Sequence, residues 1–447
     1  MKKKYLNTLV ALALLAGTWG AFTYYDKRKS RETPKVTTSA QEKILPIDGQ
    51  HIQSIRFGPH GGIAVTCRRE GGTWAIVEPQ KLAADQAALS SFVNSLTSAT
   101  VDEVVDPHPS SLKDFGLDPP AFSLEGSTDA QPAKFTLLLG DETPTSGGIY
   151  AQVAGNPRVV TLASYLKSSL EKSLFDLRDR RALALDADQI QKIEAQSKEK
   201  KWTLAKNPEG VWDLVLPPPV RADRFAVEGL VSQLRGLTMQ SIVAEDKEKS
   251  GQYGFGAPEL RLQLSGPSGI QTLVLGKKQE TDSSRSYAMN SALTPVFTLS
   301  SDFLTQFKKD PADLREKDLF SFSAFEVKRV EIDAPKGHRV FERQKGNEWK
   351  QTAPSAKNLA TAKMDTLLSR LRDLRVDSFP KGGDLAQFGL TKPAYQFMVR
   401  FGDKNQTETM QASKVGEHVY ARRTTDSLPC ELPKTALDDL EKALNDL

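Results

Sequence analysis

The sequence predicts an α+β protein with three tandem homologous domains, each a mainly antiparallel sheet with two helices, after one N-terminal transmembrane helix. Two observations lead to this fold class. Landmark residues recur at intervals of roughly 137 residues along most of the chain, which is the signature of internal repeats. Before the first repeat, residues 5–25 carry no charged side chain and are rich in leucine and alanine. A length of 447 residues suits three domains of ordinary size.

The N-terminal segment predicts a membrane anchor. As a helix, residues 5–25 would span about 31 Å, which matches the hydrocarbon core of a bilayer. Trp19, Tyr24 and Tyr25 lie at its far end, where aromatic rings favour the membrane interface. We therefore expect a cytoplasmic tail and anchor over residues 1–29 and a tether over residues 30–48. A cleaved signal peptide is the alternative, because lysines precede the apolar segment.

The three repeat units are expected at residues 49–185, 186–321 and 322–447. Each unit begins with strands, which in the first unit lie near residues 52–57 and 63–69. A third strand carries a tryptophan that a proline follows five residues later. We interpret the tryptophans as core residues, although an aromatic ligand platform is the alternative. These tryptophans are Trp74, Trp212 and Trp349.

An amphipathic helix is expected next in each unit, because four apolar residues fall at positions i, i+3, i+4 and i+7. Asp85 and Asp223 are the expected N-caps, and Thr361 is expected to replace them in the third unit. A final helix is expected near residues 162–172, 300–309 and 433–447. The apolar quartets are Leu89, Phe92, Val93 and Leu96, then Val227, Leu230, Val231 and Leu234, then Met364, Leu367, Leu368 and Leu371.

Between these helices, a polar loop leads to an aromatic residue, a glycine and, four residues later, a proline. Further strands are expected in the first unit near residues 122–125, 134–139, 149–153 and 158–162. We interpret the glycines and prolines as residues that set turns. They are Gly116, Gly254, Gly389, Pro120, Pro258 and Pro393. Two further motifs are Leu139-Gly140, Leu275-Gly276 and Val415-Gly416, then Tyr150-Ala151, Tyr287-Ala288 and Tyr420-Ala421.

An Asp-Leu-Arg triplet closes the first two units. It places Asp176 beside Arg178 and Asp313 beside Arg315, whereas the third unit ends without one. A motif found only where another unit follows indicates a clamp between units. A catalytic acid and guanidinium pair is the less favoured alternative.

Composition and motifs argue against several function classes. The net charge of +4 is concentrated in residues 1–32, so the remaining chain offers no basic excess for nucleic acid. Cys67 and Cys430 are the only cysteines, which excludes a disulfide-rich scaffold, and we expect two unpaired thiols rather than a bridge. The five histidines have no metal-ligand spacing, and no phosphate-binding loop or nucleophile elbow occurs. The sequence therefore predicts no catalytic residue, no metal site and no cofactor.

Taken together, the anchor, the Trp and Pro element, the helix and the aromatic-Gly signal resemble the bacterial family DUF4340. The resemblance covers nearly the whole chain and is clearest over residues 202–315. It implies a membrane-anchored protein that works beside the permease and auxiliary components of gliding-type ABC transporters. It implies no catalytic residue, because the family has none established.

Our leading hypothesis is a non-enzymatic scaffold or accessory subunit of an ABC-type export or surface-assembly complex. It would be a single-pass protein of the inner membrane, with its body in the periplasm or outside the cell. Its expected partner is an ABC permease or an auxiliary membrane protein. The alternative is an envelope module that binds a glycan or peptide. A hydrolase assembled from distant residues ranks last.

Overall fold

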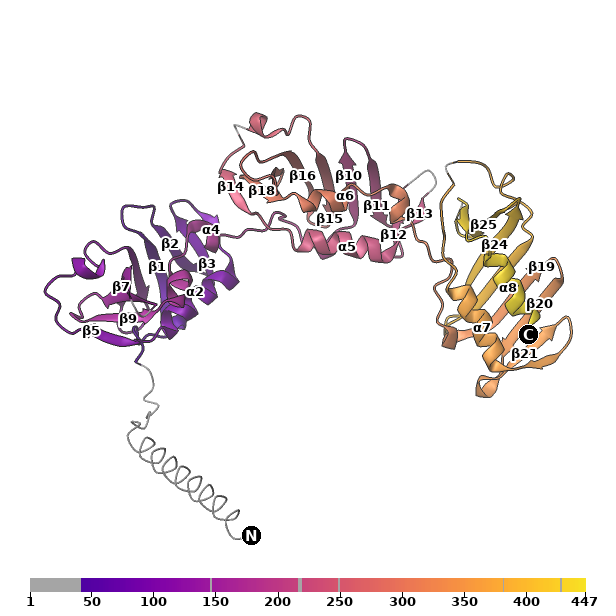
Figure 1. Cartoon of the computed structure of the whole chain (residues 1–447), viewed down its shortest axis with the longest axis horizontal. Helices are drawn as coiled ribbons and strands as arrows, with labels where there is room; N and C mark the ends of the chain where they lie inside the picture. The colour runs from indigo at the N-terminus through magenta and orange to yellow at the C-terminus, as the bar shows by residue number, and fades with distance from the viewer. Residues whose placement is uncertain (1–41, 145–146, 216–218, 248–249, 381, 427) are drawn as a thin grey trace, which may run out of the picture. The chain divides into compact units, whose positions relative to one another are not determined.

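The computed structural model describes residues 42–447, except 145–146, 216–218, 248–249, 381 and 427 (Figure 1). Its described part forms three antiparallel sheets with a few helices. The chain divides into two compact units between Asp179 and Arg180, so the first unit holds the first sheet and the second unit holds the other two. The predicted antiparallel α+β class is confirmed. The predicted domain boundaries at residues 185 and 321 stay predictions.

The first sheet is a meander of nine strands in the order β4-β3-β2-β1-β6-β7-β8-β9-β5. Alternating apolar side chains in its strands bury one face, as Phe135, Leu137 and Leu139 do in β7. The strands are β1 (Ile52–Pro59), β2 (Val65–Glu70), β3 (Thr73–Glu78), β4 (Leu82–Ala83), β5 (Glu103–Asp106), β6 (Phe122–Thr128), β7 (Lys134–Glu142), β8 (Gly148–Val153) and β9 (Val159–Ala163).

The second sheet repeats this order as β13-β12-β11-β10-β15-β16-β17-β18-β14. Its interior is again lined by alternating residues, such as Leu260, Leu262 and Leu264 of β15. The strands are β10 (Lys192–Ser197), β11 (Lys201–Lys206), β12 (Trp212–Leu214), β13 (Val220–Arg221), β14 (Ser241–Ala244), β15 (Leu260–Gly266), β16 (Gly269–Lys278), β17 (Arg285–Asn290) and β18 (Val296–Ser300).

The third sheet has eight strands in the order β22-β21-β20-β19-β23-β24-β25-β26. At the edge where β5 and β14 close the other sheets, Ser378 makes an isolated bridge to Glu431. The strands are β19 (Val327–Ala334), β20 (Gly337–Arg343), β21 (Trp349–Ala353), β22 (Lys357–Leu359), β23 (Tyr395–Phe401), β24 (Gln406–Val415), β25 (His418–Arg423) and β26 (Cys430–Leu432).

Helices cover one face of each sheet, and all three predicted apolar quartets are buried in their helices. In the third sheet α7 and α8 contact each other above the strands (Figure 1). The final helices exist but are shorter than predicted. The helices are α2 (Gln86–Ser98), α3 (Tyr165–Leu170), α4 (Leu174–Leu177), α5 (Arg224–Arg235), α6 (Asp302–Phe307), α7 (Thr361–Arg372) and α8 (Ala436–Asn445).

The helix caps follow the prediction in two of three cases. Asp85 accepts a hydrogen bond from Ala88 N (3.0 Å), and Asp223 accepts one from Ala226 N (2.8 Å). The expected cap at Thr361 is wrong, because this residue is already the first of α7 and its N-cap, Ala360, has no side-chain acceptor. Helix α7 therefore begins without the side-chain hydrogen bond that starts α2 and α5.

The polar loop predicted after the first helix contains a strand that the sequence pattern missed. Residues 103–106 form β5, and Val104 pairs with Val160 of β9. In the second sheet β14 does the same against β18. Both strands are short and have no fully buried residue, so they lack the alternation that indicates a strand.

The described residues contain no helix that is both long and apolar enough to cross a membrane. The predicted anchor over residues 5–25 lies outside the described part of the chain.

The strand register corrects one predicted motif in the third repeat. Leu139 pairs with Ala151 and Leu275 with Ala288, but Ala421 pairs with Ala412. The third counterpart of the Leu-Gly pair is therefore Ala412-Ser413, and the alignment with Val415-Gly416 is wrong. Gly416, with a φ of 61°, belongs to the turn between β24 and β25 instead.

The glycines of this motif allow a loop to approach the sheet closely. A Cβ atom on Gly140 would lie 2.1 Å from the Phe115 carbonyl oxygen, and one on Gly276 would lie 2.0 Å from that of Tyr253. In the third sheet Ser413 bears a side chain, whose Oγ donates to the Gly389 carbonyl oxygen (2.8 Å). The loop is thus held by backbone proximity in two sheets and by a serine hydroxyl in the third.

We predict that Gly276→Ala lowers the free energy of unfolding by about 1–3 kcal/mol, because the new methyl group must displace backbone atoms. Gly256→Ala is the matched control, since a Cβ atom there meets no atom within 4 Å. Thermal unfolding of both variants measures the effect. Equal midpoints for the two would contradict the predicted close approach.

Candidate functional site

Each repeated tryptophan lies beside a cationic side chain on the neighbouring strand, which is its direct cross-strand partner. A cation over an indole ring contributes about 0.5–2 kcal/mol, more where water is excluded. The sequence contains this signal, because a basic residue precedes each tryptophan at nearly the same distance. The pairs, with the distance from cation to ring centroid, are Arg69–Trp74 at 4.9 Å, Lys206–Trp212 at 5.2 Å and Arg343–Trp349 at 4.8 Å.

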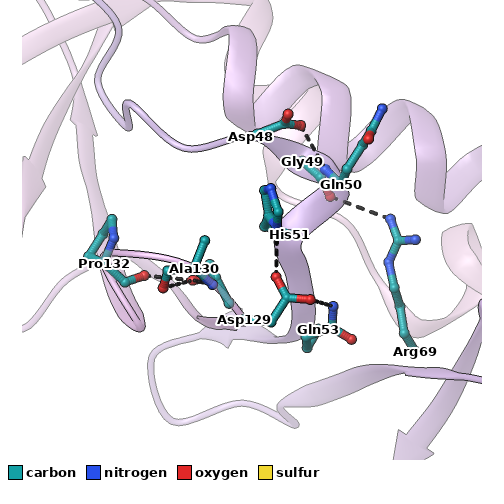
Figure 2. Close-up of polar contacts among 10 residues, drawn as sticks. Asp48, Gly49, Gln50, His51, Gln53, Arg69, Asp129, Ala130 and Pro132 are labelled. Carbon is teal, nitrogen blue, oxygen red and sulfur yellow. Dashed lines mark hydrogen bonds and ion pairs between the residues drawn. The ribbon is translucent and has the colours of Figure 1, made fainter.

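The arginines of these pairs also hold the turn that precedes the first strand of their sheet. Figure 2 shows Arg69 beside η1 (Gly49–His51), where its Nη2 donates to the Gly49 carbonyl oxygen (3.4 Å). In the third sheet Arg343 Nη2 donates to the Ala324 carbonyl oxygen (2.6 Å) in η6 (Ala324–Glu326). The repeated geometry of tryptophan, cation and turn is structural in these two sheets.

Trp212 differs from its two counterparts in exposure. Trp74 and Trp349 are buried, as expected of core residues, whereas Trp212 is half-buried. In the second sheet another tryptophan, Trp202 of β11, fills the interior. It stacks on Phe307 with ring centroids 6.2 Å apart, and its Nε1 donates to the Phe307 carbonyl oxygen (3.3 Å). Because Trp202 occupies the interior, Trp212 can remain partly exposed at the surface.

The aromatic-Gly signal and the Tyr-Ala motif meet in every sheet. Each glycine has a left-handed backbone, with φ of 65° at Gly116, 82° at Gly254 and 68° at Gly389, which explains why glycine stands there. The three prolines lie just before β6, β15 and β23. These are packing and turn elements. The aromatic pairs, with their centroid distances, are Phe115–Tyr150 at 5.1 Å, Tyr253–Tyr287 at 4.7 Å and Phe388–Tyr420 at 4.7 Å.

The first Asp-Leu-Arg triplet closes the first sheet on the start of its own helix. Ser173 is the N-cap of α4 and forms a capping box with Asp176, whose carboxylate accepts from Ser173 N (2.8 Å) while Ser173 Oγ accepts from Asp176 N (3.3 Å). The Leu177 carbonyl oxygen accepts from Asp85 N (2.9 Å), and Arg178 is buried. Any role of Asp176 and Arg178 as a clamp to the next repeat stays a prediction.

The second triplet contacts the start of α5 in the same way, and it also contacts a residue that packs against the third sheet's core. The Leu314 carbonyl oxygen accepts from Asp223 N (2.8 Å), and the Arg315 guanidinium lies 3.6 Å above the Phe379 ring. Phe379 packs against the core of the third sheet. Burial lowers the pKa of Arg315, whereas Asp313 is exposed. Arg315 is therefore the member of the predicted clamp that contacts both sheets of the second unit.

A groove of about 1010 Å³ lies next to this junction in the second unit. We name it the Phe225 groove, after a side chain that is 72% exposed. Trp212 and the first turn of α5 form one side, and the residues after Arg315 and the end of α7 form the other. Its volume is in the range that binds small ligands or short peptide segments. Its aromatic residues are Trp212, Phe225, Phe320 and Phe322.

Charged side chains of both signs line the Phe225 groove. Arg375 pairs with Asp318 at 3.0 Å, and Arg372 pairs with Asp373 at 3.0 Å. Arg221 and Arg224 also line the groove, and no carboxylate in the described part of the chain lies within ion-pair distance of either. The full charged lining is Arg221, Arg224, Arg372, Arg375, Glu316, Asp318 and Asp373.

The first and second sheets hold the start of their helices by different contacts. There Gln86, the first residue of α2, holds Trp74 by two backbone hydrogen bonds of 2.8 Å. The first residue of α5 is Arg224, and the Trp212 carbonyl oxygen accepts from Ala222 N instead (3.0 Å). Sequence reasoning missed Arg224 and Phe225, because the repeats differ at these two positions, whereas Trp212 of the same groove is one of the repeated tryptophans.

A comparison with models of protein families gives one match. The model described as "Domain of unknown function (DUF4340)" matches residues 74–213 and 212–393, which together cover well over half of the chain. The chain belongs to the DUF4340 family. The two matched segments begin at Trp74 and Trp212, the equivalent tryptophans of the first two sheets. No curated protein and no solved structure matches this DUF4340 protein.

Three histidines of this DUF4340 protein pair with carboxylates, but at separate places in the sheets. In Figure 2, His51 Nδ1 lies 2.7 Å from Asp129 Oδ1, and Gln53 donates to the other carboxylate oxygen (2.8 Å). A hydrolytic triad also needs a nucleophile on the imidazole. The hydroxyl of Ser54 in β1 is hydrogen-bonded to that of Ser127 instead (2.6 Å). Among the described residues there is no group of three or more potential metal ligands.

Both cysteines are buried and free, as predicted. Burial raises the pKa of each thiol to about 12. Since the thiolate is the reactive form, Cys67 and Cys430 are structural thiols near neutral pH.

We predict that Arg315→Ala speeds cleavage by chymotrypsin after Phe320 and Phe322, which are buried in the intact protein. The loss of a buried cation over an aromatic ring should weaken this junction by roughly 1–2 kcal/mol. Arg261→Ala on the exposed side of β15 is the matched control. Identical cleavage rates in the two variants would refute the clamp.

The stability of the protein should depend on pH through the half-buried carboxyl group of Glu316. Burial raises its pKa above the usual value, so the folded state holds the proton to higher pH than the unfolded chain does. Its stabilising effect is complete below the unfolded pKa and is lost as pH rises through the folded pKa. Glu316→Gln should therefore raise the melting temperature more near neutral pH than near pH 4. A pH-independent difference would contradict this assignment.

Proposed function

We propose that this DUF4340 protein is a non-enzymatic scaffold or accessory subunit of an ABC-type export or surface-assembly complex. In this proposal one helix over residues 5–25 anchors the chain in the inner membrane. Three tandem homologous domains follow in the periplasm or outside the cell, and the partner is an ABC permease or an auxiliary membrane protein. The resemblance to DUF4340 proteins motivates the choice of complex.

The Phe225 groove is the observation that carries the binding role. A phenylalanine with 72% of its surface exposed, beside a half-buried tryptophan, costs solvation free energy unless a partner covers it. Both walls of the groove and the contact between Arg315 and Phe379 lie within the same compact unit. Such a site suits the capture of another protein.

The same groove supports the alternative, an envelope module that binds a glycan or peptide without a membrane partner. Trp212 and Phe225 offer aromatic faces, to which sugar rings bind by stacking. The two functions differ in what remains bound when the protein is taken out of the membrane.

We predict that full-length protein, crosslinked in membranes and solubilised in detergent, captures an ABC permease or its auxiliary subunit through the Phe225 groove. Mass spectrometry identifies the partners. Phe225→Ala should reduce recovery several-fold, because central aromatic residues carry much of the energy of an interface. Phe325→Ala is the matched control, since Phe325 is 88% exposed and does not line the groove.

Recovery of the bait alone, under conditions where a known membrane complex survives, would overturn the scaffold proposal and favour the ligand-binding module. Recovery of a permease by wild type and both variants would keep the scaffold but move its contact away from the groove.

A further inference from the structure

We propose that the Phe225 groove binds an acidic peptide segment that also carries an apolar side chain. The partner in this assignment rests on the scaffold function proposed above, while the chemistry of the bound segment rests on the groove itself.

The charge of the groove favours carboxylates. Arg372 and Arg375 already have carboxylate partners within the lining, but no carboxylate of the described residues pairs with Arg221 or Arg224. Guanidinium groups bind carboxylates by paired, charge-assisted hydrogen bonds, which makes arginine the preferred partner of such groups. Two guanidinium groups therefore remain available to an incoming segment.

The aromatic side chains of the groove select a segment that is apolar as well as acidic. Phe225 lies exposed on the first turn of α5, and Val211 and Trp212 lie on the same wall. Covering an exposed phenylalanine with an apolar side chain is favourable, because it removes apolar surface from water. A segment with alternating carboxylates and apolar side chains would match both features.

Carboxylates in the lining disfavour dense polyanions. Glu316, Asp318 and Asp373 lie in the same groove as the four arginines, so a nucleic acid or polyphosphate would bring phosphates next to negative groups. A peptide presents its charges sparsely, and its backbone N–H groups can donate to these carboxylates. The mixed lining thus matches a peptide better than a polyphosphate.

Neutral sugars fit less well than an acidic peptide, because a cation already lies over the ring of Trp212 and another over that of Phe225. Lys206 Nζ lies 5.2 Å from the centroid of Trp212, and the Arg224 guanidinium lies 5.0 Å from that of Phe225. These cations leave a positive potential beside the rings, which attracts carboxylates. The aromatic faces and the guanidinium groups therefore act on the same ligand.

The test is fluorescence anisotropy with detergent-solubilised full-length protein and a labelled peptide of alternating aspartate and leucine around a central phenylalanine. Arg224→Gln and Phe225→Ala each give α5 the residue that α2 has at the same position, since α2 begins with Gln86 and Ala87. Both variants should therefore fold. We expect each to weaken binding by roughly tenfold, and added salt to weaken it for the wild type. Arg261→Gln and Phe325→Ala, outside the lining, should bind like the wild type.

Four results would overturn the assignment. The first is no binding of the acidic peptide. The others are equal binding of a peptide with asparagine in place of aspartate, unchanged affinity in the Arg224 and Phe225 variants, and tighter binding of polyglucuronate than of the peptide. If a permease is still captured, the scaffold function survives that failure. If the peptide binds through the groove but no membrane protein is captured, the scaffold function fails and the peptide site stands.

Discussion

Each of the three sheets depends on the burial of one of its faces beneath an amphipathic helix. The four apolar residues on α2, α5 and α7 are buried, and they contact strands whose alternating residues point the same way. Burial of apolar surface is the dominant favourable contribution to folding. It also fixes where the helix must begin, and therefore where the tryptophan strand and the closing Asp-Leu-Arg segment can pack.

The repeated residues meet the same physical demand in different ways. The loop that carries the aromatic-Gly signal approaches the sheet over glycine in two cases and is hydrogen-bonded by Ser413 in the third. The tryptophan strand is held by Gln86 in the first sheet and by no glutamine in the second, where Trp202 supplies the interior ring. Repetition therefore preserves the sheet while individual contacts change.

The candidate binding site arises at positions where the repeats differ. Arg224 and Phe225 occupy the first turn of α5, and the residues after Arg315 complete the groove from the other side. A side chain in the first turn of a helix can change without disturbing the buried face, because that face is defined by positions further along. A protein of repeated sheets can thus acquire a binding surface on one unit while it keeps a common core.

The sequence alone determined the antiparallel α+β class, the membership of DUF4340, the buried helix faces and two of the three helix caps, because periodicity and capping are local properties. Only the tertiary structure decided the edge strands β5 and β14 and showed that Ala412-Ser413 is the third counterpart of the Leu-Gly pairs. It also decided the exposure of Trp212 and the contact of Arg315 with Phe379. These features depend on which distant segments pair, and no short-range pattern encodes a register or a groove between segments of the chain that lie far apart.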